Sequence, residues 1–258
     1  MTKVIAIANQ KGGVGKTTTS VNLSAALAGL GVRVLLIDLD PQGNATMGSG
    51  IDKRELTVSI YDWLMADAVL STARKSTVGG YDLLPSNIDL TAAEVGLMQV
   101  QEREFVISKG LVGQAQEYDY VIIDCPPSLN ILTVNALVSA TGVLVPMQCE
   151  YYALEGLSAL LDTVEGIKAS ANPGLQIEGL VRTMYDARNS LSRDVSRQLI
   201  QYFGKKVYRT VVPRNVRLAE APSHGLPVMM YDRNSRGSLA YQALANEMHK
   251  RHMAPPSA

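Results

Sequence analysis

Residues 10–18 read QKGGVGKTT, between an apolar run at residues 4–8 and a helical pattern at residues 17–30. Gly12, Gly13 and Gly15 permit backbone conformations and close approaches that a side chain would block. The successive backbone N–H groups of such a loop point inward as a cradle for an anion, and a helix that begins near Lys16 adds its positive end. A glycine-rich surface turn with two lysines is the alternative, but strand, loop, Gly-Lys-Thr and helix follow in the order of a phosphate-binding loop, or P-loop.

The contacts of the loop with a bound nucleotide follow from this assignment. Lys16 is expected to reach the β- and γ-phosphates, and the Thr17 hydroxyl to ligate Mg²⁺. The residues expected to surround the phosphates are Lys11, Gly12, Gly13, Val14, Gly15, Lys16, Thr17 and Thr18. The loop departs from the usual pattern because Gln10 stands where glycine is usual, and Lys11 adds a second lysine. No guanine-reading Asn-Lys-x-Asp or Thr-Lys-x-Asp segment is present in the sequence, which favours ATP over GTP.

Apolar strands and helical patterns alternate along the chain. Strands are predicted at residues 4–8, 32–37, 81–84, 120–123, 142–146, 177–181 and 206–212, and helices at residues 17–30, 130–140, 153–170 and 192–203. Several strands are apolar almost throughout, as expected when helices cover both faces of a parallel sheet. The pattern predicts an α/β fold with a doubly wound, mostly parallel sheet, whose ligands lie at the carboxyl ends of the strands. We expect one domain, residues 1–251, and a frayed, disordered tail at residues 252–258.

The composition is that of an ordinary globular protein. Of the 258 residues, 47% are hydrophobic and 19% are charged, with 24 Lys and Arg against 24 Asp and Glu. No overall charge attracts nucleic acid or membrane, so binding to either needs a local cluster. Cys125 and Cys149 are too few for a disulfide framework, and the sequence has neither a signal peptide nor an apolar stretch that could span a membrane. These features favour a reducing cytoplasm, with both cysteines as small buried residues.

Two predicted strands lead into carboxylates at the expected ligand edge of the sheet. Asp124 ends the apolar run at residues 121–124, the Walker B arrangement, and is expected to bind Mg²⁺ through water and to hydrogen-bond Thr17. Asp38 and Asp40 follow the strand predicted at residues 32–37.

Four segments together resemble the ParA family of DNA-partitioning ATPases, which is grouped with MinD and the nitrogenase iron protein among P-loop proteins with a deviant Walker A loop. They are KGGVGKTTTSVNL at residues 11–23, LLIDLDPQGN at 35–44, VIIDCPPS at 121–128 and PRNVRLAEAPSHGLP at 213–227. The resemblance implies a weak, Mg²⁺-dependent ATPase in which Lys16 and Lys11 are catalytic and Asp40 positions or deprotonates the attacking water. It implies that Asp38 helps to hold the Mg²⁺ shell; the alternative is that Asp38 caps a helix or turn.

The resemblance also implies a homodimer that forms on ATP binding. In the family the early lysine, here Lys11, crosses a nucleotide-sandwich dimer and touches the phosphates of the other subunit, as an arginine finger does in trans. Gly12 then lies on the dimer face, where a side chain would obstruct contact. The alternative is that Lys11 contacts phosphate in its own subunit. The backbone at Pro213 and Asn215 is expected to lie against adenine, although this segment could be an ordinary loop.

A basic cluster lies in the last third of the chain. Between residues 182 and 217, nine Arg and Lys stand against two Asp, a net charge of +7 that leaves −7 for the rest of the chain. A solvated helix face could produce this bias. In ParA-like dimers, however, arginines that match Arg188 and Arg217 bind double-stranded DNA without sequence preference, and Arg193 and Arg197 are spaced to extend one helix face. The resemblance further implies association with the nucleoid, and release when a ParB-like centromere-binding protein stimulates hydrolysis.

Other functions of the same fold predict other features. A MinD-like cell-division ATPase would end in a basic amphipathic membrane helix, whereas residues 248–256 are short and interrupted by proline. A metabolic ATP-dependent enzyme would need a substrate pocket, for which the sequence has no motif. A helix-turn-helix regulator would need a domain before the P-loop, and a nitrogenase-like iron protein would need other cysteine contexts. We therefore expect chromosome or plasmid partitioning without membrane binding, with the MinD-like and metabolic alternatives open.

Overall fold

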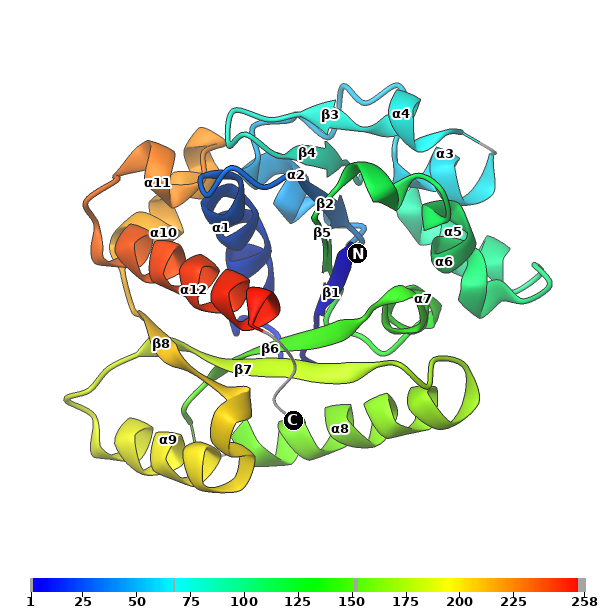
Figure 1. The fold of residues 1–258 in the computed structure, drawn as a ribbon. Helices are drawn as coiled ribbons and strands as arrows, with labels where there is room; N and C mark the ends of the chain where they lie inside the picture. The colour runs from blue at the N-terminus through cyan, green and yellow to red at the C-terminus, as the bar shows by residue number, and fades with distance from the viewer. Residues whose placement is uncertain (1, 67, 151–152, 255–258) are drawn as a thin grey trace.

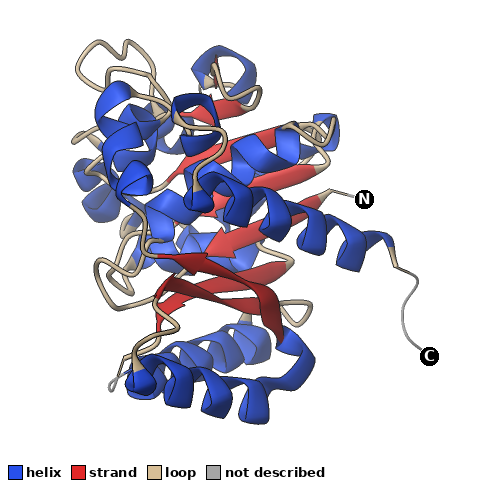
Figure 2. Ribbon diagram, turned by 90° about the vertical axis from the view of Figure 1, so that its left-hand side faces the viewer, coloured by secondary structure: helices blue, strands red, loops and turns tan. Residues whose placement is uncertain are grey.

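The computed structural model describes residues 2–66, 68–150 and 153–254. In this part of the chain, eight strands form one sheet in the order β3-β4-β2-β5-β1-β6-β7-β8 (Figures 1 and 2). The strands are β1 Lys3–Ile7, β2 Val34–Asp38, β3 Lys75–Ser76, β4 Asp82–Leu84, β5 Tyr120–Asp124, β6 Gly142–Gln148, β7 Gln176–Tyr185 and β8 Val207–Pro213. Neighbouring strands pair in parallel, except that β3 and β4 are antiparallel. The predicted doubly wound, mostly parallel sheet is confirmed.

Helices cover both faces of the sheet because its strands are apolar on both sides (Figure 2). The α-helices are α1 Lys16–Ala28, α2 Asn44–Gly48, α3 Ile60–Met65, α4 Leu70–Ala73, α5 Leu90–Leu97, α6 Val106–Leu111, α7 Ile131–Ser139, α8 Ala153–Ser170, α9 Ser190–Phe203, α10 Val216–Glu220, α11 Val228–Tyr231 and α12 Arg236–Met253. Alternate residues of β1 belong to different cores: Ile7 packs in a core with α1 and α12, and Ala6 packs in a core with α5, α7 and α8. Cys125 and Cys149 are buried in the second core, as predicted.

The carboxyl ends of β1, β2 and β5 meet at one edge of the sheet. In the parallel register, Ile7 of β1 and Asp38 of β2 both lie beside Asp124 of β5. The loop after β1 leads directly into α1. The predicted P-loop and both strand-end carboxylates therefore share this edge, where ligands of open α/β sheets bind.

The predicted elements agree with the structure less well at the C-terminus. Each predicted strand overlaps an observed strand, and residues 153–170 form α8. The antiparallel β3, the helices α2 to α6 and the helices α10 to α12 were not predicted. The frayed tail that we expected from residue 252 is wrong at His252 and Met253, which belong to α12. His252 Nε2 lies 3.0 Å from Glu178 Oε2, and its Nδ1 lies 3.0 Å from the Tyr120 hydroxyl, so the last turn is held against the sheet.

The remaining tail residues that we expected to be disordered, 255–258, lie outside the described residues. In the part of the chain that the structure describes, no helix combines the length and the apolar character needed to cross a membrane.

Candidate nucleotide site

The loop between β1 and α1 has the backbone of an anion cradle. Gly13 and Gly15 have φ angles of 73° and 90°, a region that favours glycine. Gly15 is the N-cap of α1, and no side chain caps this helix, so its positive end faces the loop. Thr183 Oγ1 donates a hydrogen bond of 2.7 Å to the Val14 carbonyl and so fixes the loop to the end of β7. The loop is thus preorganised for an anion.

Lys16 brings a buried positive charge to the loop. The residue is 8% exposed, and its Nζ donates to the Lys11 carbonyl at 3.3 Å. Burial lowers the pKa of Lys16, and the negative charge of Asp124 opposes this effect. A bound phosphate would offset the cost of burying the amine because it brings the opposite charge next to it. Lys16 and five other predicted phosphate ligands line one cavity of about 300 Å³: Gly12, Gly13, Gly15, Thr17 and Thr18. Val14, which was also predicted, is buried and does not line it.

Asp124 has a carboxylate oxygen without a partner. The residue is fully buried; Ser20 Oγ donates to its Oδ1 at 2.8 Å, whereas its Oδ2 accepts no hydrogen bond from any described residue. Burial, and next the charge of Asp38, raise the pKa of Asp124 to about 7, against the lowering effect of the Ser20 and Thr17 hydroxyls. Mg²⁺ takes oxygen ligands, and an unpaired buried carboxylate oxygen near a hydroxyl fits that requirement.

Ser20 was not among the predicted site residues. It lies one turn after Lys16 on α1, so the same face of the helix presents both residues. Its hydroxyl donates to Asp124 Oδ1, which ties the first turns of α1 to the end of β5. The four-residue spacing from Lys16 was the signal in the sequence that could have identified it.

Asp38 and Asp40 have different surroundings. Asp38 is fully buried, and its Oδ2 accepts hydrogen bonds of 2.7 Å from both the N–H and the hydroxyl of Thr46, while its Oδ1 accepts one of 3.2 Å from the Asp40 N–H. These contacts cap the first turn of α2, which is the alternative role that we considered for Asp38. Asp40 lines the phosphate cavity, and its Oδ1 accepts a hydrogen bond of 2.9 Å from the Gln42 N–H. The predicted Mg²⁺ role of Asp38 and catalytic role of Asp40 stay predictions.

A second cavity, of about 170 Å³, adjoins the phosphate cavity. Pro213 and Asn215, the residues predicted to lie against adenine, line it. The residues common to both cavities are Gly15, Thr18 and Met184. The two cavities are therefore contiguous in the way that a base and a triphosphate would require.

Lys11 and Gly12 are both accessible at the start of the loop, and Gly12 also lines the phosphate cavity. Lys11 Nζ forms an ion pair with Glu150 Oε2 at 2.6 Å, and the lysine side chain is 39% exposed. Lys11 does not line the phosphate cavity. A Cβ built at Gly12 would meet no atom of the described chain within 4 Å, and the φ of Gly12 is not positive. Nothing in the described part of the chain therefore requires glycine at position 12.

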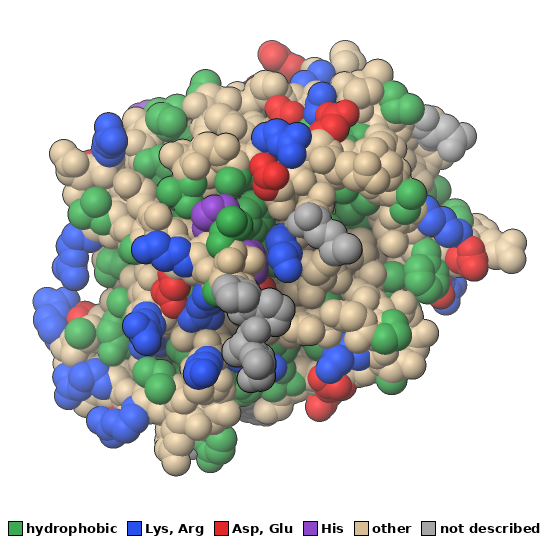
Figure 3. Space-filling view, viewed as in Figure 1, with side chains coloured by type: hydrophobic (Ala, Val, Ile, Leu, Met, Phe, Trp, Pro, Cys, Tyr) green, Lys and Arg blue, Asp and Glu red, His purple; other side chains and the backbone are tan. Residues whose placement is uncertain are grey.

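The four predicted DNA-binding arginines do not form one helix face. Arg193 and Arg197 lie on α9, whereas Arg188 precedes α9 and Arg217 lies on α10. Three of them form exposed ion pairs: Arg188 with Asp186, Arg197 with Asp194, and Arg217 with Glu220 and Asp232. Lys and Arg side chains gather over α9 and β8, at the lower left of the view in Figure 3.

Arg182 does not belong to this surface, although its charge was counted in the basic cluster. It is 7% exposed, and it donates to Ser196 Oγ and to the carbonyls of Tyr208 and Arg209. Burial lowers the pKa of Arg182. The exposed excess of positive charge is therefore smaller than the sequence count indicates.

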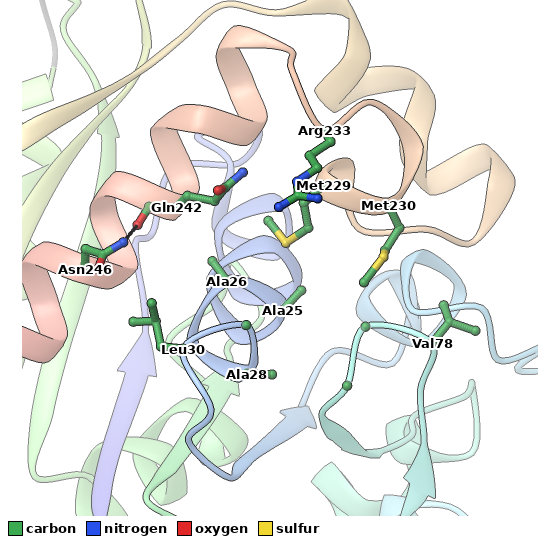
Figure 4. Close-up of a pocket in the computed structure, with 13 residues that line it drawn as sticks. Ala25, Ala26, Ala28, Leu30, Val78, Met229, Met230, Arg233, Gln242 and Asn246 are labelled. Atoms are coloured by element: carbon green, nitrogen blue, oxygen red, sulfur yellow. Dashed lines mark hydrogen bonds between the residues drawn. The ribbon is translucent and has the colours of Figure 1, made fainter.

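A larger cavity, of about 420 Å³, lies away from this edge of the sheet. It is bounded by the end of α1, the turn between β3 and β4, and the helices α11 and α12 (Figure 4). Ala25, Ala28 and Met229 line it, and Arg233 is the one charged residue among its described lining residues. It lacks the glycine-rich loop and the carboxylates of the first site, so it is not the phosphate site.

A P-loop and a buried Walker B carboxylate at the carboxyl edge of a doubly wound sheet define a P-loop nucleoside-triphosphate-binding protein. A protein-family model described as an AAA domain matches residues 2–177. The crystal structure of cobyrinic acid a,c-diamide synthase from Mycobacterium smegmatis with bound ADP and magnesium is similar, with a TM-score of 0.86 and 39% identity, over 98% of this chain and 96% of that chain.

Full-length relatives specify the family. The chain is 53% identical over 249 residues to the sporulation initiation inhibitor protein Soj of Bacillus subtilis strain 168, covering 96% of this chain and 98% of Soj. It is 51% identical over 249 residues to the chromosome partitioning protein ParA of Caulobacter vibrioides strain NA1000, covering 95% of this chain and 93% of ParA. The chain belongs to the ParA family of ATPases.

Proposed function

We propose that this protein is a DNA-partitioning ATPase that binds MgATP, dimerises around it and holds double-stranded DNA until hydrolysis. Its similarity to Soj of B. subtilis and ParA of C. vibrioides over nearly the whole chain supports the class. The observation that carries the mechanism is the surface position of Lys11 beside an unobstructed Gly12. A lysine that lies outside its own phosphate cavity can reach the cavity of a second subunit.

Within one subunit, the P-loop N–H groups and Lys16 hold the triphosphate. Thr17 and the unpaired Oδ2 of Asp124 would hold Mg²⁺, which would supply positive charge to neutralise the triphosphate. Asp124 must be ionised to do this, and the cation favours ionisation against the effect of burial. Asp40, at the wall of the same cavity, orients or deprotonates the attacking water.

Across the dimer, Lys11 of each subunit leaves Glu150 and contacts the phosphates held by the other subunit. The ion pair with Glu150 is exposed on both sides, so breaking it costs little. Gly12 lets the two P-loops approach. Dimerisation therefore depends on bound triphosphate, whose negative charge replaces that of Glu150 as the partner of Lys11.

The dimer then binds DNA through arginines of both subunits. Arg188 and Arg217 supply the main phosphate contacts, and Arg193 and Arg197 add to them. Two contacts per subunit neutralise roughly four phosphates in a dimer, which gives a log–log salt slope of about −3.6. A ParB-like centromere-binding protein stimulates hydrolysis. The dimer then separates, and its subunits leave the nucleoid for the cytoplasm. The cargo is a chromosome or a plasmid.

Stimulation of hydrolysis tests this function. ATP turnover is measured with nonspecific duplex DNA, with a ParB-like partner from the same cell, with both and with neither. We expect the largest rate when both are present, because only a DNA-bound dimer is the partner's target. Turnover that neither DNA nor partner changes would contradict the proposal.

A metabolic ATP-dependent synthase is the second candidate, because the M. smegmatis structure is 39% identical over nearly the full chain. It predicts that cobyrinic acid, rather than DNA and partner, stimulates ATP hydrolysis in the same assay. A MinD-like membrane role is less well supported, because Leu244 and Met248, apolar residues of α12, are fully buried. Flotation with anionic liposomes tests the membrane role, and we expect no ATP-dependent flotation.

A further inference from the structure

The end of β7 is irregular at the point where the two cavities meet. Its register against β8 shifts between Arg182 and Tyr185, and Met184 within this stretch has a φ of 47°. A left-handed backbone is uncommon for methionine, and non-glycine residues held in this way cluster at ligand sites. Bulges in strands next to active sites commonly redirect a side chain. An irregular strand end of this kind is therefore expected to orient the Met184 side chain for contact with a ligand.

Contacts on both sides hold Met184 in place. Gln148 Nε2, at the end of β6, donates a hydrogen bond to Met184 Sδ. The preceding residue, Thr183, donates to the Val14 carbonyl, and its Cγ2 lies 3.8 Å from the position that a Cβ of Gly15 would occupy. The same strand end thus supports the P-loop and carries Met184, so the distance between loop and methionine is fixed.

Met184 joins the two cavities. In the described chain it is the one residue outside the P-loop that lines both the cavity of the phosphate ligands and the cavity of Pro213 and Asn215. A nucleoside triphosphate that fills both cavities must place its sugar at their junction. The Met184 side chain is partly exposed and so is accessible to a ligand. A thioether is polarisable, adapts to irregular surfaces and makes favourable contacts with ring edges.

We propose that Met184 is a positioning residue for the nucleoside: its thioether packs against the ribose and the adjoining edge of the base, and so sets their position relative to the P-loop. This inference rests on the proposed binding of ATP and adds the residue that connects base and phosphate recognition. It requires that Met184 affects ligands that carry a nucleoside and not ligands that consist of phosphates alone.

Calorimetric binding measurements on variants of Met184 and on one control variant test the proposal. Met184→Gly removes the side chain and suits the left-handed backbone, and Met184→Leu keeps an apolar side chain of similar volume. Glu102→Gly is the matched control, because Glu102 is the other described non-glycine residue with a positive φ, 53°, and it lines neither cavity. Met184→Ala gives the same comparison with a Cβ retained, should the glycine variant be unstable. The ligands are MgATP and magnesium tripolyphosphate.

We expect Met184→Gly to weaken ATP binding roughly tenfold and to change tripolyphosphate binding by less than about twofold. KM for ATP rises by a similar factor while kcat is unchanged, since the reacting phosphates are not displaced. Met184→Leu keeps the apolar volume but loses the sulfur that Gln148 contacts, so it is expected to lose less ATP affinity than Met184→Gly, and Glu102→Gly stays close to the wild type. If Met184→Gly lost equal affinity for ATP and for tripolyphosphate, Met184 would only support the P-loop, and the proposal would be wrong. An unchanged affinity for ATP would also contradict it. A wild-type protein that does not bind ATP would instead contradict the proposed function.

Discussion

Asp38 and Asp124 lie side by side in the parallel register of β2 and β5, and both are fully buried. Burial raises the pKa of Asp38 to about 6 and that of Asp124 to about 7, and the charge of Asp38 adds to the rise at Asp124. Two neighbouring buried carboxylates resist ionisation together. The folded chain therefore carries a cost at this edge of the sheet that a bound cation would relieve.

The stability of the protein without Mg²⁺ or nucleotide is predicted to fall as pH rises from about 4 to about 7. In this range the folded state retains protons that the unfolded state has lost, because both folded pKa values exceed the ordinary value of 3.8. Asp124→Asn removes one of the two titrating carboxyls and their repulsion, so the pH dependence of stability becomes weaker, and the part caused by the burial of Asp38 remains. We expect it to raise Tm by about 2–4 °C or more at pH 7.5, and to have little effect at pH 4. Calorimetric scans at several pH values measure this.

Asp52→Asn is the control for this experiment. Asp52 is partly exposed, and the hydrogen bonds from Arg54 lower its pKa to about 2, so it titrates below the relevant range. Its variant is expected to keep the wild-type slope between pH 4 and pH 7. An Asp124→Asn variant with that same slope would show that Asp124 is ionised throughout and would contradict the predicted coupling.

Asp40 is predicted to act in the chemical step and not in nucleotide binding. Asp40→Ala is expected to lower hydrolysis by about 10²–10⁴-fold, the range for a general base, with ATP affinity nearly unchanged. Single-turnover hydrolysis and calorimetric ATP binding measure the two properties separately. Asp40→Asn, which keeps the shape but not the basicity, distinguishes proton transfer from positioning. Turnover at the wild-type rate in both variants would rule out the assignment.

Lys11 is predicted to act across the dimer. Lys11→Ala is expected to reduce hydrolysis stimulated by DNA and partner by roughly 10²-fold or more, since a charge supplied in trans accounts for larger factors elsewhere. Glu150→Gln, which removes only the ion pair on the surface, is the matched control and is expected to keep full stimulated activity. Mixing Lys11→Ala subunits with an excess of Asp40→Ala subunits distinguishes action in trans from action in cis. In the mixed dimer one subunit keeps Asp40 and the other keeps Lys11. Hydrolysis is restored if the lysine acts in trans and is not restored if it acts in cis.

Arg217 is predicted to contribute to DNA binding in spite of its ion pairs with Glu220 and Asp232. Arg217→Glu is expected to abolish ATP-dependent retention on duplex DNA and to leave ATP binding unchanged, because it replaces a phosphate contact by a repulsion. Arg54→Glu is the matched control: Arg54 is also exposed and paired with a neighbouring acid, Asp52, but it lies outside the basic cluster. Equal retention of both variants on DNA would contradict the assignment of Arg217.

The sequence predicted the P-loop edge of the fold well because its information is local. The loop, its helix and the strand-end carboxylates are contiguous motifs, and parallel pairing brings their ends together without further information. The ion pair of Lys11 with Glu150 joins residues 139 positions apart. The contacts that make Arg182 a buried residue likewise come from a different helix and strand. No local pattern indicates such pairings, so the count of exposed charge was too high.

The helix α12 was missed for a different physical reason. Small residues, among them Gly237, Ser238 and Ala245, form much of its buried face, so the apolar periodicity that identifies an amphipathic helix is weak. Tertiary packing against α1 and β8 stabilises it instead. Leu244→Ala is therefore predicted to lower the free energy of unfolding by about 2–5 kcal/mol, as for other fully buried leucines. Chemical denaturation measures this change, and exposed Leu239 on the same helix is the control, with an expected change below about 0.5 kcal/mol for Leu239→Ala.

The size of the Asp40→Ala protein with and without MgATP tests the central claim most directly. In light scattering coupled to size exclusion, this hydrolysis-deficient variant is predicted to be a monomer alone and a dimer with MgATP, and only the dimer retains nonspecific duplex DNA. Adding Lys11→Ala to the same chain is predicted to abolish the dimer. An Asp40→Ala protein that remains monomeric at saturating MgATP, or that binds duplex DNA equally well without nucleotide, would contradict the account.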